Sequence, residues 1–126
     1  MKKKEFVYNY DKEVDVLYIS FSHGERATAA VELNDNILLR LNHKEKRAVG
    51  LTLMDFSVLV QLTELGPRSF PLNGLTELEP EWQDMVIEII TKPPVNQILK
   101  VSVYTPFVNE TIPIAHVEKL PVSVPA

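Results

Sequence analysis

Apolar residues recur at every second position along four consecutive segments between residues 16 and 54. This period of two places alternate side chains on opposite faces of a β-strand, whereas a helix needs apolar residues three and four positions apart. Polar turns separate the segments, among them Asn34-Asp35-Asn36, whose residues tolerate the left-handed backbone of a tight hairpin. The apolar positions are Leu17, Ile19 and Phe21, then Ala29, Val31 and Leu33, then Ile37, Leu39 and Leu41, and finally Val49, Leu51 and Leu53.

A further strand is expected before these four, because Phe6, Tyr8 and Tyr10 also alternate. The segments together predict an antiparallel β-meander over residues 6–54 with one apolar face. Such a face has to be covered, usually by helices or a second sheet. The residues expected to point inward are Leu17, Ile19, Val31, Leu39 and Leu51.

One covering helix is predicted over residues 79–91, and Pro93 and Pro94 follow it. It is capped either by Thr76 and Glu79, which have capping-box spacing, or by Glu79 alone with Pro80 in the first turn. Its apolar residues form a single stripe that consists of Trp82, Met85, Val86, Ile89 and Ile90.

A shorter helix is predicted from Asp55 or Ser57 through Leu65, with Gly66 at its C-terminal stop and Pro67 just beyond. Residues 97–104 and 111–117 alternate again and predict a C-terminal pair of strands. The second of these is expected at an edge, because Pro113 cannot donate a hydrogen bond to a ladder.

These elements predict an α+β fold, in which the antiparallel β-meander of residues 6–54 is covered by one or two helices and followed by the C-terminal pair of strands. A chain of 126 residues suits one domain. We therefore expect a single domain over residues 1–126. The meander and short helix occupy residues 6–65, and a helix-containing extension occupies residues 66–126.

The segment from Tyr10 to Ser20, with the sequence YDKEVDVLYIS, resembles the opening motif of the DUF2283 family of small prokaryotic proteins. The resemblance covers about residues 6–58, with Ser57 near the usual closing serine. It implies the meander with a following helix, in a bacterial or archaeal cytoplasm, and it implies no reaction. Some members look as though they are paired with small toxins, so an antitoxin-like role is one alternative.

Several classes of function lack their usual residues. Cysteine is absent, which excludes disulfides and thiolate chemistry and fits a cytoplasmic protein. The net charge of -4 offers no global attraction to nucleic acid, and no segment approaches the roughly 18 apolar residues of a membrane span. The three histidines lack metal-ligand spacing, and four glycines leave no phosphate-binding loop. We expect no catalytic residues, no metal ligands and no cofactor.

The candidate binding residues lie in the resembling segment and are Tyr10, Asp11, Glu13, Asp15 and Tyr18. Alternate carboxylates can converge on a hard cation such as calcium, but the glycine and the bidentate acid of an EF-hand loop are missing. The simpler interpretation is that this loop turns the chain and solvates a strand entry. A second candidate contact is the basic hairpin tip from His43 to Arg47.

Our first hypothesis is a non-catalytic binding or assembly module that self-associates as a dimer or docks a small protein partner through a strand edge or the outer face of its sheet. Outward residues Val16, Tyr18 and Leu38 are candidates for an exposed patch. The alternatives are an antitoxin-like component of a toxin–antitoxin pair and a small-ligand or metal-dependent enzyme centred on Asp11, Glu13 and Asp15.

Overall fold

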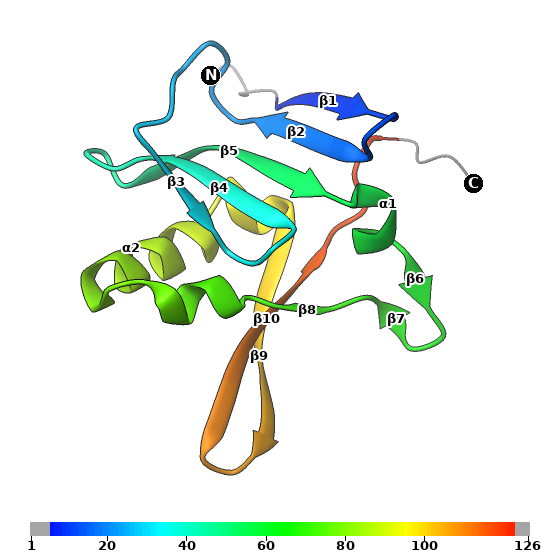
Figure 1. Ribbon diagram of the computed structural model, residues 1–126, viewed down its shortest axis with the longest axis vertical. Coiled ribbons are helices and arrows are strands. Elements are labelled where there is room, and N and C mark those ends of the chain that lie inside the picture. Colours follow the sequence, from blue (N-terminus) through cyan, green and yellow to red (C-terminus); the bar gives the residue numbers. More distant parts are fainter. Residues whose placement is uncertain (1–5, 123–126) are drawn as a thin grey trace.

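Five antiparallel strands form the main sheet of the computed structural model, which describes residues 6–122 (Figure 1). They lie in the order β1-β2-β5-β4-β3. Strands β3 to β5 form a meander, and the β1–β2 hairpin joins it through β5, so the connection from β2 to β3 crosses to the far edge. The predicted α+β class and antiparallel sheet are confirmed. The bounds are β1 Val7–Asp11, β2 Val16–Ser20, β3 Ala29–Glu32, β4 Ile37–Asn42 and β5 Arg47–Met54.

The inward face of this sheet carries the residues that the alternation predicts. Each of these residues is at most 6 % exposed. Burying one such side chain contributes about 1.5–3 kcal/mol to the stability of the fold, before chain entropy is subtracted. The prediction of the inward face is therefore confirmed for Leu17, Ile19, Val31, Leu39 and Leu51.

Helix α2 (Pro80–Ile90) packs beneath the sheet, with a 3₁₀ helix on either side of it, η1 (Asn73–Glu77) and η2 (Val95–Gln97) (Figure 1). Glu79 is its N-cap residue and Pro80 its first residue, so the second predicted capping arrangement is present. Val86, Ile89 and Ile90 are buried, and Trp82 and Met85 pack against the core at its rim. The predicted stripe therefore does cover the sheet.

The predicted helix through Leu65 is wrong in length, because helix α1 contains only Phe56–Leu59. The chain then forms a small hairpin of β6 (Leu62–Thr63) and β7 (Gly66–Pro67), in which Thr63 Oγ1 donates to the Gly66 carbonyl at 2.8 Å. Gly66 has a positive φ of 116° and belongs to this turn, not to a helix stop. A longer helix would bury nothing, since Leu62 is 75 % exposed and Leu65 fully exposed.

A second sheet of three strands has the order β8-β10-β9, with β8 at Phe70–Pro71, β9 at Leu99–Phe107 and β10 at Glu110–Val117. The C-terminal pair of strands is confirmed, but the edge position predicted for β10 is wrong, because β10 lies between the other two. The Leu72 N–H donates to the Pro113 carbonyl at 2.8 Å. The nitrogen of Pro113, which carries no hydrogen, therefore also faces the end of the two-residue strand β8. The proline thus costs only one hydrogen bond between β10 and its neighbours.

One hydrophobic core joins residues of both sheets and of α2, from Leu17 and Leu39 to Leu72, Val86 and Ala115. The single domain over residues 1–126 stays a prediction. Residues 1–5 and 123–126 of that range lie outside the described residues. None of the helices between residues 6 and 122 has the length and hydrophobicity of a membrane span.

Candidate functional site

Three polar residues meet where the β1–β2 hairpin passes the start of α1. The Tyr10 hydroxyl donates to Asp15 Oδ1 at 2.6 Å. From the other side, the Ser57 hydroxyl donates to Asp15 Oδ2 at 2.6 Å, and the Ser57 N–H donates to Oδ1 at 3.0 Å. The carboxylate of Asp15 thus fastens α1 to a loop that precedes it by 42 positions.

The backbone of Asp15 takes part in the same junction. Its φ of 56° is in the left-handed region, which Asp tolerates better than most residues, and its carbonyl accepts the Phe56 N–H at 3.0 Å. Burial by itself would raise the pKa of Asp15, but the hydrogen bonds from Ser57 and Tyr10 outweigh it and hold the pKa below its usual range. The bond to Asp15, with burial and the charge of Asp15, raises the pKa of Tyr10 to about 12.

The other predicted site residues do not join this cluster. Asp11 Oδ1 accepts the Glu13 N–H at 3.1 Å, which turns the chain locally, and Glu13 is exposed. Tyr18 lies on the outer face of β2, paired with Asn9 and Thr52. Among residues 6–122, no three His, Asp or Glu side chains are grouped as metal ligands would be. In the structure, the carboxylates of Asp11, Glu13 and Asp15 are therefore not gathered around one point.

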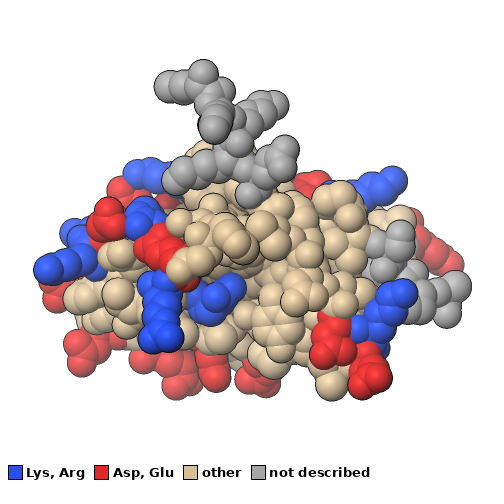
Figure 2. Space-filling model, turned by 90° about the horizontal axis from the view of Figure 1, so that it is seen from above, with Lys and Arg blue, Asp and Glu red and all other residues tan. Residues whose placement is uncertain are grey.

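The outer face of the main sheet carries part of the expected apolar patch. Tyr18 is 44 % exposed, whereas Val16 and Leu38 are half-buried. Viewed from the side of β1 and β2, uncharged residues occupy the middle of the face, and charged residues gather mostly around its rim (Figure 2). The exposed apolar area of this patch is thus small and centred on one tyrosine.

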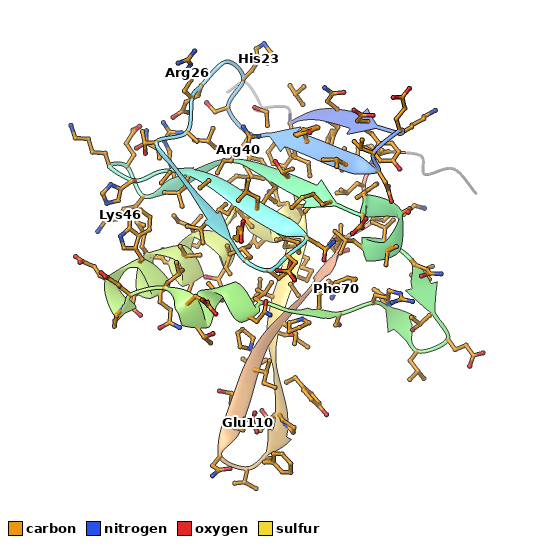
Figure 3. The ribbon with its side chains drawn as sticks, in the orientation of Figure 1. His23, Arg26, Arg40, Lys46, Phe70 and Glu110 are labelled. Carbon is orange, nitrogen blue, oxygen red and sulfur yellow. The ribbon has the colours of Figure 1, made fainter. Side chains whose placement is uncertain are left out.

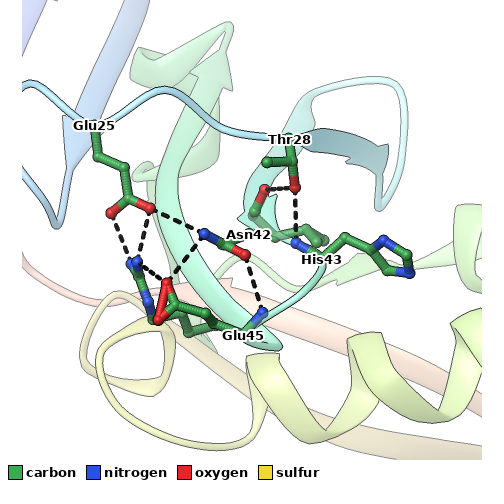
Figure 4. Close-up of polar contacts among 7 residues, drawn as sticks. Glu25, Thr28, Asn42, His43 and Glu45 are labelled. Atoms are coloured by element: carbon green, nitrogen blue, oxygen red, sulfur yellow. Dashed lines mark hydrogen bonds and ion pairs between the residues drawn. The ribbon is translucent and has the colours of Figure 1, made fainter.

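The basic hairpin tip between β4 and β5 is tied into the fold. Arg47 donates two hydrogen bonds of 2.7 Å to Glu25 in the β2–β3 connection and a third of 2.6 Å to Glu45 (Figure 4). The bonds from Arg47 above all lower the pKa of Glu25 to about 2. The His43 ring stacks on Trp82 of α2 at 4.8 Å between centroids. These contacts hold the crossing connection in place and leave less positive charge for a ligand.

Two open pockets lie in different parts of the surface. One, of about 470 Å³, lies between β3 and η1 and is lined partly by Glu32, Asp35 and Glu77. The other, of about 430 Å³, lies between α1, the β6–β7 hairpin and the end of β10, and its lining is mainly apolar. His116 borders this second pocket, and its Nε2 lies 3.3 Å from Glu118 Oε1.

Strands β9 and β10 form a hairpin, here called the arm (residues 99–117), that projects from the body of the protein (Figures 1 and 3). Glu110 lies near its far end and Phe70 at its root (Figure 3). Its large apolar side chains are exposed at Val103 (65 %), Tyr104 (54 %), Phe107 (67 %) and Val108 (fully). Isolated exposed apolar residues are common, whereas these four lie within six positions, on both faces of the hairpin, and concentrate exposed apolar surface there.

The arm also lacks charge along one stretch. Residues 101–109 contain no charged residue, whereas 24 % of the chain is charged. Cores of protein interfaces are depleted in charge and enriched in tyrosine and phenylalanine. None of the predicted site residues lies on the arm, although the uncharged stretch of residues 101–109 can be read from the sequence.

Comparison with known proteins gives one match. The model of the family described as a protein of unknown function (DUF2283) matches residues 8–57, which contain β2 to β5, all of β1 except Val7, and the Tyr10–Asp15–Ser57 cluster. No curated protein and no solved structure matched the chain. The suspected resemblance is thus confirmed for the main sheet, and the arm lies beyond the match. The chain is therefore similar to the DUF2283 family over residues 8–57, and the residues that form the arm lie beyond this match.

Proposed function

We propose that this protein is a non-catalytic binding module, which takes up an extended, mostly uncharged segment of another polypeptide as an added strand along the edge of β9. The observation that carries this proposal is the arm, whose exposed apolar residues stand next to a strand edge that no other strand of residues 6–122 pairs with. In strand addition, backbone hydrogen bonds supply affinity and side-chain contacts supply selectivity.

The direction of the backbone groups on β9 follows from the pairing of β10. The Pro113 carbonyl faces β8, where it accepts the Leu72 N–H. In an antiparallel strand the N–H and C=O of one residue point to the same side, so Pro113 and its partner Val103 form a non-hydrogen-bonded pair. The N–H and C=O of Val103 therefore point away from β10, and so do those of Val101, two residues earlier.

The far side of β9 is open. In the part of the chain that the structure describes, β9 ends the three-stranded sheet. Natural proteins usually protect such an edge with charges or with an inward proline. The charge-free stretch around Val103 carries no such charge, and Pro106 lies beyond the regular pairing of Leu99 to Tyr104. The edge from Val101 to Val103 is therefore suited to accept a strand.

The partner that fits this edge is extended, mostly uncharged and rich in β-branched residues. Val101, Val103 and Thr105 are themselves β-branched, and cross-strand pairs of such residues stabilise a sheet. The antitoxin-like role and the ligand-dependent or metal-dependent enzyme stay predictions.

A blocked peptide of alternating valine and threonine, with a lysine at each end for solubility, provides a direct test. Titrated to millimolar concentration, it is expected to shift the backbone amide signals of Val101 and Val103 in ¹⁵N–¹H spectra and to slow their hydrogen exchange. Val103→Pro removes the outward N–H and breaks no bond to β10, so this variant should fold but lose binding. Val103→Thr keeps the N–H and should retain binding. In a sample that is monomeric, unchanged amide signals at millimolar peptide would refute strand addition.

A further inference from the structure

We infer that the strand added to β9 is β9 of a second copy of this chain, in an antiparallel pair whose two-fold axis passes between the two Ser102 residues. This inference rests on the proposed strand addition and names its partner. A two-fold interface requires a surface that is complementary to itself, because each residue meets its counterpart in the reciprocal position. The sequence of β9 meets that requirement.

The regular part of the strand fixes the register. Leu99 to Tyr104 pair continuously with β10, and a bulge interrupts the pairing after Tyr104. Intermolecular hydrogen-bonded pairs must join residues whose backbone groups face the open edge, namely Val101 and Val103. Pairing Val101 with Val103 of the second copy, and the reverse, uses both residues of each strand and stays ahead of the bulge. Ser102 then lies opposite Ser102 of the second copy.

Each face of the paired strands is complementary in this register. On one face, the four valines of the two copies meet as β-branched pairs. They continue an apolar face along β9 that is buried at Leu99, half-buried at Val101 and 65 % exposed at Val103. On the other face, Lys100 lies opposite Tyr104 of the second copy, where the ammonium group can contact the ring. The central serine pair is small and uncharged, so no like charges oppose each other.

The same register carries the tip of each arm toward the other copy. Residues 107 and 108 extend past the paired stretch toward η2 of the second copy, since antiparallel strands run in opposite directions. Covering the exposed parts of Tyr104 and Phe107 buries on the order of 250 Å² per copy. With the valines and the backbone, two copies bury on the order of 1,000 Å², the lower bound of a specific interface. We therefore expect a dimer with a Kd in the micromolar range.

The central position permits a charge-swap test. Ser102 is exposed, so Ser102→Lys and Ser102→Glu should both fold. Each variant alone places like charges opposite each other and should weaken the dimer about fivefold or more. An equimolar mixture of the two variants pairs lysine with glutamate and should recover dimer formation. Sedimentation equilibrium over about 1 µM to about 500 µM measures all three samples and the wild type.

Cysteine variants report the register independently, because the natural chain contains no cysteine. Opposed residues of a non-hydrogen-bonded antiparallel pair lie within disulfide range, so Ser102→Cys should form a disulfide-linked dimer on mild oxidation. Thr105→Cys is the matched control, since its two copies lie six positions apart along the paired strands, about 20 Å, and should cross-link far more slowly.

Two results would overturn this inference. One is a wild type that stays monomeric at the highest concentration, and the other is a Ser102→Cys dimer that forms no faster than the Thr105→Cys dimer. If the wild type is monomeric but the valine–threonine peptide still protects Val101 and Val103, strand addition holds and the second copy is not the partner. If neither association is observed, the proposed function falls as well.

Discussion

Replacing Asp15 with alanine tests whether the polar cluster at the end of the main sheet stabilises the fold. The carboxylate of Asp15 accepts hydrogen bonds from the Tyr10 hydroxyl, the Ser57 hydroxyl and the Ser57 N–H. Alanine removes all three bonds at once. It also places a residue with a Cβ and no compensating polar group at a φ of 56°.

The expected loss can be worked out from these contacts. Hydrogen bonds to a charged group contribute about 1.5–3 kcal/mol each, but Asp15 is only half-buried, so solvent screening reduces each bond to about 1 kcal/mol. The left-handed backbone adds about 1 kcal/mol. Asp15→Ala should therefore lower the free energy of unfolding by about 3–4 kcal/mol. For a chain of this length, the melting temperature should fall by about 10–15 °C.

Two further variants separate these contributions in thermal and urea unfolding followed by circular dichroism. Asp15→Asn keeps tolerance of the left-handed backbone and one acceptor oxygen, so it should lose about half as much as Asp15→Ala. Ser57→Ala should lose little more when Asp15 is already alanine, because its hydroxyl has then lost its acceptor. A melting temperature of Asp15→Ala within about 2 °C of the wild type would contradict this account, as would additive effects of Asp15→Ala and Ser57→Ala.

The same cluster predicts a pH dependence. The pKa of Asp15 is lowered in the folded protein from the ordinary 3.8, so its contribution to stability is present above about pH 4 and is lost as the pH falls through the folded pKa. The difference between wild type and Asp15→Ala should therefore narrow on acidification below pH 4. An unchanged difference at the lowest pH at which both proteins remain folded would argue against a charged acceptor.

Three other measurements follow from single features. Tyr10 should ionise near pH 12, not near pH 10, in the absorbance difference between wild type and Tyr10→Phe, and its stabilising effect should be lost as the pH rises between these values. Leu39→Ala should cost about 2–5 kcal/mol in urea unfolding, whereas Leu65→Ala should change stability by less than about 0.5 kcal/mol, because Leu39 is buried and Leu65 is fully exposed. Glu25→Gln should speed amide exchange in the β2–β3 connection, because it weakens the bidentate contact with Arg47.

The strands of the main sheet were predictable because each carries its own period of two, but their order was not. The segment from Phe21 to Thr28, which joins two of the predicted strands, crosses the sheet and is held by the Glu25–Arg47 contact. Its eight residues exceed the two to five of a usual hairpin loop, which was the one local signal of a crossover. Strand order depends on contacts between distant residues, and a pattern along the chain does not contain them.

The two predicted helices differ for a related reason. Leu59, Leu62 and Leu65 are each three positions apart, but Leu59 alone is buried, whereas α2 buries Val86, Ile89 and Ile90 of its apolar stripe. A short helix is marginal without tertiary packing, so the chain after Leu59 turns into the β6–β7 hairpin. In the same way, Asp15 was expected to solvate the entry of a strand, and its main partner, Ser57, was not identified because it lies 42 positions away.

The arm shows why alternation predicts a strand without predicting its surroundings. Leu99 and Val103 occupy equivalent positions of one pattern, yet Leu99 is buried and Val103 is 65 % exposed, because the strand leaves the body between them. Charge distinguishes the two situations better than periodicity does. A solvent-facing edge strand ordinarily carries charges that prevent pairing, and the stretch from residue 101 to 109 carries none. An exposed apolar edge of this kind either aggregates or has a defined partner, and the self-complementary order of Lys100 to Tyr104 favours a defined partner.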